Sequence, residues 1–106
     1  MTVRERLANR RPSEFLEFQS MDMRFTASVS RYPDGRVAEC FIDNHKQGSA
    51  VGTLVRDSAI ILSFVLQYGA DIGAIGKALS RDSAGRPLGP LGAAIDIILT
   101  NSSSGA

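Results

Sequence analysis

The chain of 106 residues is long enough for one domain with a hydrophobic core. Its 12 Lys and Arg nearly balance 11 Asp and Glu, so a net charge of +1 gives no strong field for nucleic acid or an anionic membrane. One cysteine and one histidine, Cys40 and His45, exclude an intrachain disulfide and fall short of a structural zinc site. No secretory signal is visible, and the longest apolar run, 59–66, is shorter than a membrane span. We therefore expect a cytoplasmic protein without membrane attachment, metal or cofactor.

Residues 1–13 are polar and basic, and we expect them to form an N-terminal arm. The arm contains four arginines: Arg4, Arg6, Arg10 and Arg11. One interpretation is a nucleic-acid-binding module that uses these arginines, and the other is a frayed, solvated terminus.

Strand patterns fill the N-terminal half. A short candidate strand covers 14–18, and alternating apolar residues follow at Met23, Phe25, Ala27 and Val29. This period of two predicts a strand over 21–31 with one face on a core. The sequence Tyr32-Pro33-Asp34-Gly35 is typical of a turn, and a further strand is expected over 37–42. The three segments predict an antiparallel sheet.

Helical periodicity replaces this alternation from residue 49 onward. We predict a long helix over 49–68 with Ser49 as its N-cap, a short helix over 72–79 with Asp71 as its cap, and a last helix over 90–99. The expected fold is α+β, with a sheet of about three strands packed under one long and two shorter helices. A single domain then covers 14–100, and the Ser- and Gly-rich residues 101–106 form a disordered tail.

The long helix is apolar on more than one side. Ile60 and Phe64 lie opposite the side of Val55 and Leu62, so a sheet on one face cannot cover them all. Either the two C-terminal helices or a second subunit covers the remaining side. We expect a homodimer through Ile60 and Phe64.

Several segments together resemble the TSCPD domain, found near the C-terminus of vitamin B12-dependent (class II) ribonucleotide reductases and as short free-standing bacterial proteins. The residues that carry the resemblance are Gln47-Gly48-Ser49, Asp57 to Ser63, Leu66 to Gly69, Arg81, Gly85-Arg86-Pro87 and Leu91-Gly92. The start Asn9 to Ser13 is similar to that of the free-standing kind.

The resemblance implies a non-catalytic binding or regulatory module, with a protein partner in nucleotide metabolism. A reductase needs a thiyl-forming cysteine and a reducing cysteine pair, and Cys40 alone cannot supply them. We therefore expect no enzymatic activity from this chain. Cys40 itself, in a strand, is expected to be a small buried residue.

The turn before the long helix is the best candidate for a ligand site. Free amides and the helix dipole attract anions at a helix start, and Lys46, His45, Gly48 and Ser49 lie there. This pattern predicts a nucleotide or phosphate ligand, although it is not a Walker loop and an ordinary capped helix would have the same sequence.

The loop over 81–89 offers a second polar group, Arg81 and Arg86, which we include among the ligand-binding candidates. Asp57, within the long helix, either forms a salt bridge with one of these arginines or faces solvent, and we favour the salt bridge. An alternative function is a small enzyme with a site near His45 and Asp57, which requires a pocket where the two side chains converge.

Overall fold

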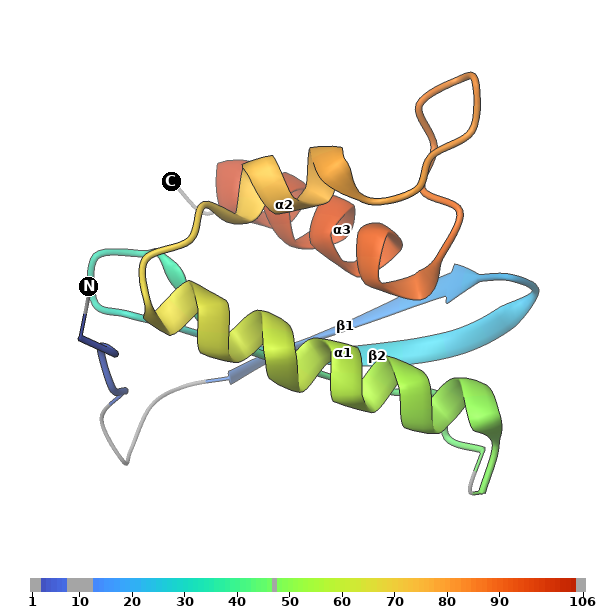
Figure 1. Ribbon diagram of the computed structural model, residues 1–106, viewed down its shortest axis with the longest axis horizontal. Coiled ribbons are helices and arrows are strands. Elements are labelled where there is room, and N and C mark those ends of the chain that lie inside the picture. Colours follow the sequence, from blue (N-terminus) through green and yellow to red (C-terminus); the bar gives the residue numbers. More distant parts are fainter. Residues whose placement is uncertain (1–2, 8–12, 47, 105–106) are drawn as a thin grey trace.

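The computed structural model describes residues 3–7, 13–46 and 48–104, and within them it confirms the predicted α+β fold. Three antiparallel strands, β1 (Ser13–Ser20), β2 (Met23–Arg31) and β3 (Val37–Asp43), form one sheet in the order β1-β2-β3. Three helices follow: α1 (Ala50–Gln67), α2 (Ile72–Ala78) and α3 (Pro90–Ser104). Figure 1 shows the helices on one side of the sheet.

The alternating pattern of β2 determines which face of the sheet is buried. Phe25, Ala27 and Val29 are almost fully buried, and the register places Ile42 and Cys40 of β3 beside Ala27 and Val29. Between β2 and β3, the turn ends at Gly35, whose φ of 95° is a left-handed conformation that glycine adopts without strain. The predicted turn and strand pairing are both confirmed.

The helices divide the sheet between them. α1 packs on β3, α3 packs on β1, and α2 rests on α3. The core lies between these layers and consists mainly of residues from β2, β3, α1 and α3: Phe25, Ala27, Val29, Val37, Cys40, Ile42, Val55, Ala59, Leu62, Leu66, Ala94, Ile95 and Ile98. The C-terminal helices therefore lie beside α1 and leave its outer side open, with Ile60 37% and Phe64 46% exposed.

Local hydrogen bonds to capping side chains fix where α1 and α2 begin. Ser49 is the N-cap of α1 and accepts a hydrogen bond from the Gly52 amide at 2.9 Å, and Asp71 caps α2 through the Gly73 amide at 3.2 Å. Both predicted caps are confirmed. The predicted end of the last helix at residue 99 is wrong, because α3 continues to Ser104. No glycine or proline interrupts the segment 100–104, so nothing in its backbone forces an earlier end.

The beginning of the chain is bonded to the domain. The Glu5 amide donates to the Gln67 carbonyl at 2.7 Å, and the Tyr32 hydroxyl donates to the Glu5 carbonyl at 2.5 Å. Arg36 forms a salt bridge with the Glu5 carboxylate at 3.0 Å. Residues 3–7 thus lie against the end of α1, as Figure 1 shows, and do not extend freely as an arm. Arg10 and Arg11 lie outside the described residues.

Length and composition alone would allow α1, with 18 residues, to cross a membrane. In the fold its inner face instead contributes Val55, Ala59, Leu62 and Leu66 to the core. This amphipathic use of an apolar helix is that of a core helix in a globular domain.

Candidate functional site

Four of the predicted site residues lie together before α1. His45 and Gly48 both adopt a positive φ, 63° and 74°, which turns the chain sharply from β3 into the helix. The side chain of His45 lies back on the sheet, with its Nε2 2.7 Å from Thr26 Oγ1. Lys46 is exposed, and Ser49 lies at the first turn of the helix. The structure therefore brings His45, Lys46, Gly48 and Ser49 to one end of α1.

Asn44 is the residue of this turn that the sequence interpretation missed. It is only 7% exposed, donates from Nδ2 to Ser49 Oγ at 3.0 Å, and accepts the Lys46 amide on Oδ1 at 3.1 Å. A Cβ on Gly52 would lie 2.8 Å from Asn44 Oδ1, so the asparagine packs directly on the first turn of α1. Asn44 and Ser49 thus fill the helix start with side chains of the protein itself. The sequence signal for this role was the position of Asn44 two residues before Lys46, because an Asn side chain in a turn often accepts the amide two residues further on.

Arg81 has a structural role in the loop between α2 and α3. Its guanidinium donates to both carboxylate oxygens of Asp96, at 2.8 and 3.0 Å, and also to the carbonyls of Gly76 and Gly85. This bidentate bond lowers the pKa of Asp96. Arg86 pairs with Asp82 at 3.2 Å. Figure 1 shows this loop far from the start of α1, so the arginines do not join Lys46 in one site.

The predicted salt bridge of Asp57 is wrong, because Arg81 binds Asp96 and Arg86 binds Asp82. Asp57 points outward from α1 and is exposed. Within the described part of the chain, no hydrogen bond or ion pair joins Asp57 to His45, whose ring lies 3.8 Å from the Asp43 carboxylate. The two residues do not form the convergent pocket that an enzyme site would require.

Cys40 is completely buried in β3. Burial raises the pKa of its thiol to about 12, which keeps it protonated and unreactive at neutral pH. Residues 3–7, 13–46 and 48–104 contain no cluster of three metal-ligating side chains. Neither thiol chemistry nor a metal centre is therefore built into the described fold.

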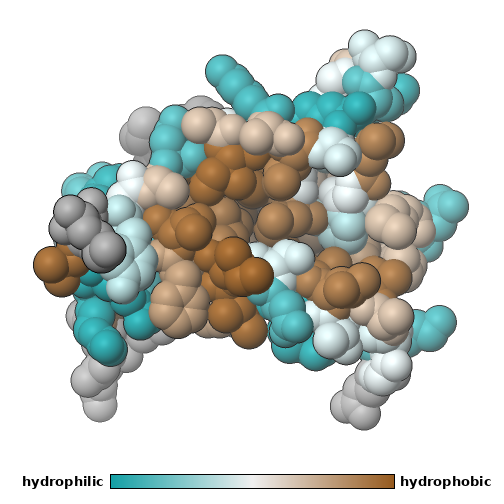
Figure 2. Space-filling view, viewed as in Figure 1, coloured by the Kyte–Doolittle hydropathy of each residue, from teal (hydrophilic) through white to brown (hydrophobic). Residues whose placement is uncertain are grey.

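An exposed apolar surface lies on the outer side of α1. We call it the outer stripe, and it consists of Leu54, Ile60, Ile61, Phe64, Val65 and Tyr68, all more than a third exposed. Figure 2 shows apolar side chains gathered along α1 and towards α2 on this face. Arg4 lies over the Phe64 ring, with its Cζ 4.4 Å from the ring centroid, and donates to Gln67 Oε1. An exposed group of apolar side chains of this kind marks an interaction site more often than a catalytic one.

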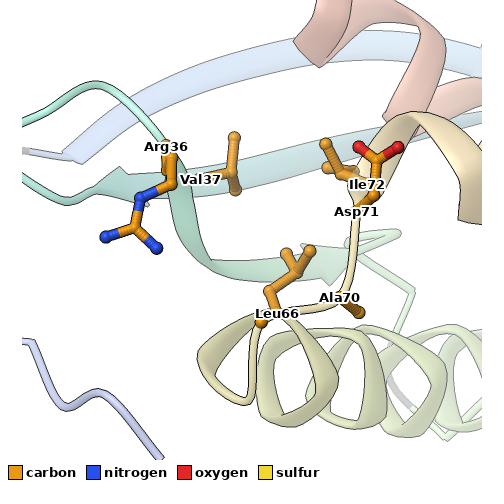
Figure 3. A pocket seen from close by; sticks show the side chains of 7 residues that line it. Arg36, Val37, Leu66, Ala70, Asp71 and Ile72 are labelled. Atoms are coloured by element: carbon orange, nitrogen blue, oxygen red, sulfur yellow. The ribbon is translucent and has the colours of Figure 1, made fainter.

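A small hollow of about 230 Å³ lies between the start of β3 and the segment joining α1 to α2. Its lining residues are Arg36, Val37, Leu66, Gly69, Ala70, Asp71 and Ile72. Figure 3 shows the Arg36 guanidinium directed away from the Asp71 carboxylate. Both charged groups are already bonded, Arg36 to Asp34 and Asp71 to the start of α2. The hollow therefore offers a mainly apolar surface. Neither of its two charged lining residues is free to orient a polar ligand.

These features define a small α+β module in which several of the candidate polar side chains, among them Asn44, Ser49 and Arg81, hold the fold. The chain is similar to vitamin B12-dependent ribonucleotide reductases: 33% identical over 72 residues to that of Bradyrhizobium diazoefficiens, 35% over 69 to that of Agrobacterium fabrum, and 36% over 69 to that of Rhodopirellula baltica. The matches cover 68%, 65% and 65% of this chain but only 6%, 5% and 7% of the reductases. The chain thus resembles a short segment of these enzymes. No protein-family model and no solved structure matches it significantly.

Proposed function

We propose that this protein is a non-catalytic binding or regulatory module of nucleotide metabolism, a free-standing counterpart of the accessory TSCPD domain of vitamin B12-dependent ribonucleotide reductases. The observation that carries the proposal is the match to about one twentieth of a reductase, since such a segment has the size of an accessory part and not of an enzyme. The single buried cysteine supports this assignment, because a reductase needs several reactive thiols.

The test has two parts. The purified chain, given ribonucleotides, a vitamin B12 cofactor and a dithiol reductant, should produce no deoxyribonucleotide. Tagged chain in native lysate of its own organism should capture an enzyme of ribonucleotide metabolism, identified by mass spectrometry. Turnover by the chain alone would refute the proposal that the module is non-catalytic. A set of captured proteins without any enzyme of ribonucleotide metabolism would refute its proposed role in nucleotide metabolism.

A nucleotide or phosphate ligand at the start of α1 is the finer part of the proposal. Lys46 and Gly48 are exposed there, and a cation beside a helix start favours an anion. The amide of Gly52 is already bonded to Ser49, so an anion would have to bind on the outside of the turn. Arg81 and Arg86 are not needed for such a site, because they lie in the separate 81–89 loop.

A further inference from the structure

We propose that the outer stripe of α1 binds the outer stripe of a second copy of this chain, with the two α1 helices antiparallel about a two-fold axis at Ile61. This inference does not depend on the proposed function. It rests on the spacing of the stripe, on the charges on either side of its centre and on the exposure of its side chains.

Three members of the stripe are spaced symmetrically about Ile61. Leu54, Ile61 and Tyr68 are seven residues apart, which places them in one row along the outer side of α1. An isologous contact requires that residue i meets residue j while j meets i. A two-fold axis at Ile61 satisfies this condition, because it places Leu54 of each copy against Tyr68 of the other and Ile61 against itself.

The charges are complementary under the same axis. Asp57 is exposed among the residues of the stripe, one turn from Leu54 and Ile61, and among the described residues no cation lies within ion-pair distance of it. The axis places Asp57 opposite Val65 of the second copy, next to the Phe64 ring over which Arg4 lies. Each dimer would therefore contain two Asp57–Arg4 pairs, one at either side of the axis. A parallel arrangement would instead place like charges together.

The exposed side chains of the stripe make a second copy with the same stripe a suitable partner, since both surfaces are apolar. A stable interface buries about 1,000 Å² or more in total. Leu54 and Ile61 are 67% and 63% exposed, and the other members of the stripe add to them. Since an isologous contact buries the same stripe on both chains, each exposed side chain contributes twice.

The experiment is sedimentation equilibrium of the full chain. The wild type should have twice the 11.4 kDa mass of one chain, and Ile61→Glu should be monomeric. Because Ile61 is mostly exposed, the monomer should keep its fold, which circular dichroism checks. The matched control is Leu88→Glu, an exposed apolar residue in the 81–89 loop, and it should remain dimeric.

Cross-linking tests the orientation. Under mild oxidation Ile61→Cys should give a covalent dimer, whereas Leu54→Cys should do so only when mixed with Tyr68→Cys. A monomeric wild type, a dimer indifferent to Ile61→Glu, a Leu54→Cys variant that links to itself, or a wild-type monomer that binds phospholipid vesicles through this face would each overturn the proposal. None of these outcomes bears on turnover or on capture of a metabolic enzyme, so the proposed function is judged separately.

Discussion

The hydroxyl of Ser63 holds α1 to the backbone of Cys40. The Cys40 amide donates to Ser63 Oγ at 2.9 Å, and the Cys40 carbonyl lies 3.0 Å from the same oxygen. One turn further along α1, at its last residue, Gln67 Nε2 donates to the Ala38 carbonyl at 3.0 Å. Because β3 has no strand on its outer side, these side chains of α1 satisfy backbone groups that would otherwise be unpaired in the core.

Ser63→Ala should lower the free energy of unfolding by about 1–3 kcal/mol, since it leaves the buried amide of Cys40 without a partner. Urea denaturation at fixed protein concentration measures the loss. Ser58→Ala is the matched control, because Ser58 donates only to the Leu54 carbonyl of its own helix. Equal stability of the two variants would contradict the role of Ser63.

Cys40 should resist alkylation in the folded protein. With its pKa raised to about 12, the thiolate fraction at pH 8 is on the order of one in ten thousand, and burial blocks the reagent as well. Iodoacetamide should modify the native chain negligibly and the urea-denatured chain completely, as intact mass will show. Stoichiometric labelling of the native chain would mean that Cys40 is accessible and would contradict its role as an unreactive buried residue.

The Arg81–Asp96 pair should make stability depend on pH. The hydrogen bonds from Arg81 lower the pKa of Asp96 below its value in the unfolded chain, about 3.9. The contribution of the pair is therefore complete above that value and is lost as the pH falls through the lower pKa of the folded state.

Asp96→Asn should cost about 1 kcal/mol at pH 7, a modest loss because the pair is partly exposed to solvent. At strongly acidic pH the variant and the wild type should become equally stable, which thermal unfolding across a pH series checks. Asp22→Asn, in the exposed turn between β1 and β2, serves as the control and should follow the wild-type curve. A constant difference between Asp96→Asn and wild type at every pH would rule out the ionic origin.

Lys46→Ala should weaken binding of inorganic phosphate or a nucleotide several-fold while leaving the fold intact, because it removes the exposed cation next to the start of α1. Titration calorimetry measures the affinity. Lys77→Ala, an exposed lysine on α2, is the matched control and should bind like the wild type. If the wild type releases no heat with phosphate or nucleotides, the ligand proposal fails.

The secondary-structure elements of this protein and their types could be predicted from local sequence patterns. Alternation in β2, the turn at Gly35 and the caps Ser49 and Asp71 are local signals, since each depends on residues only a few positions apart. The apolar excess on α1 was also visible, because it is a property of helical periodicity alone.

The pairing of residues that are distant in the chain could not be predicted in this way, because it depends on how the helices pack on the sheet. Arg81 binds Asp96 and not Asp57, Asn44 fills the start of α1, and Glu5 is bonded to Gln67 at the far end of that helix. These partners lie between 5 and 62 positions apart, and for the distant ones a charge pattern cannot distinguish one carboxylate from another. The choice depends on how α1 and α3 divide one face of the sheet, which places Asp96 beside the 81–89 loop and turns Asp57 towards solvent.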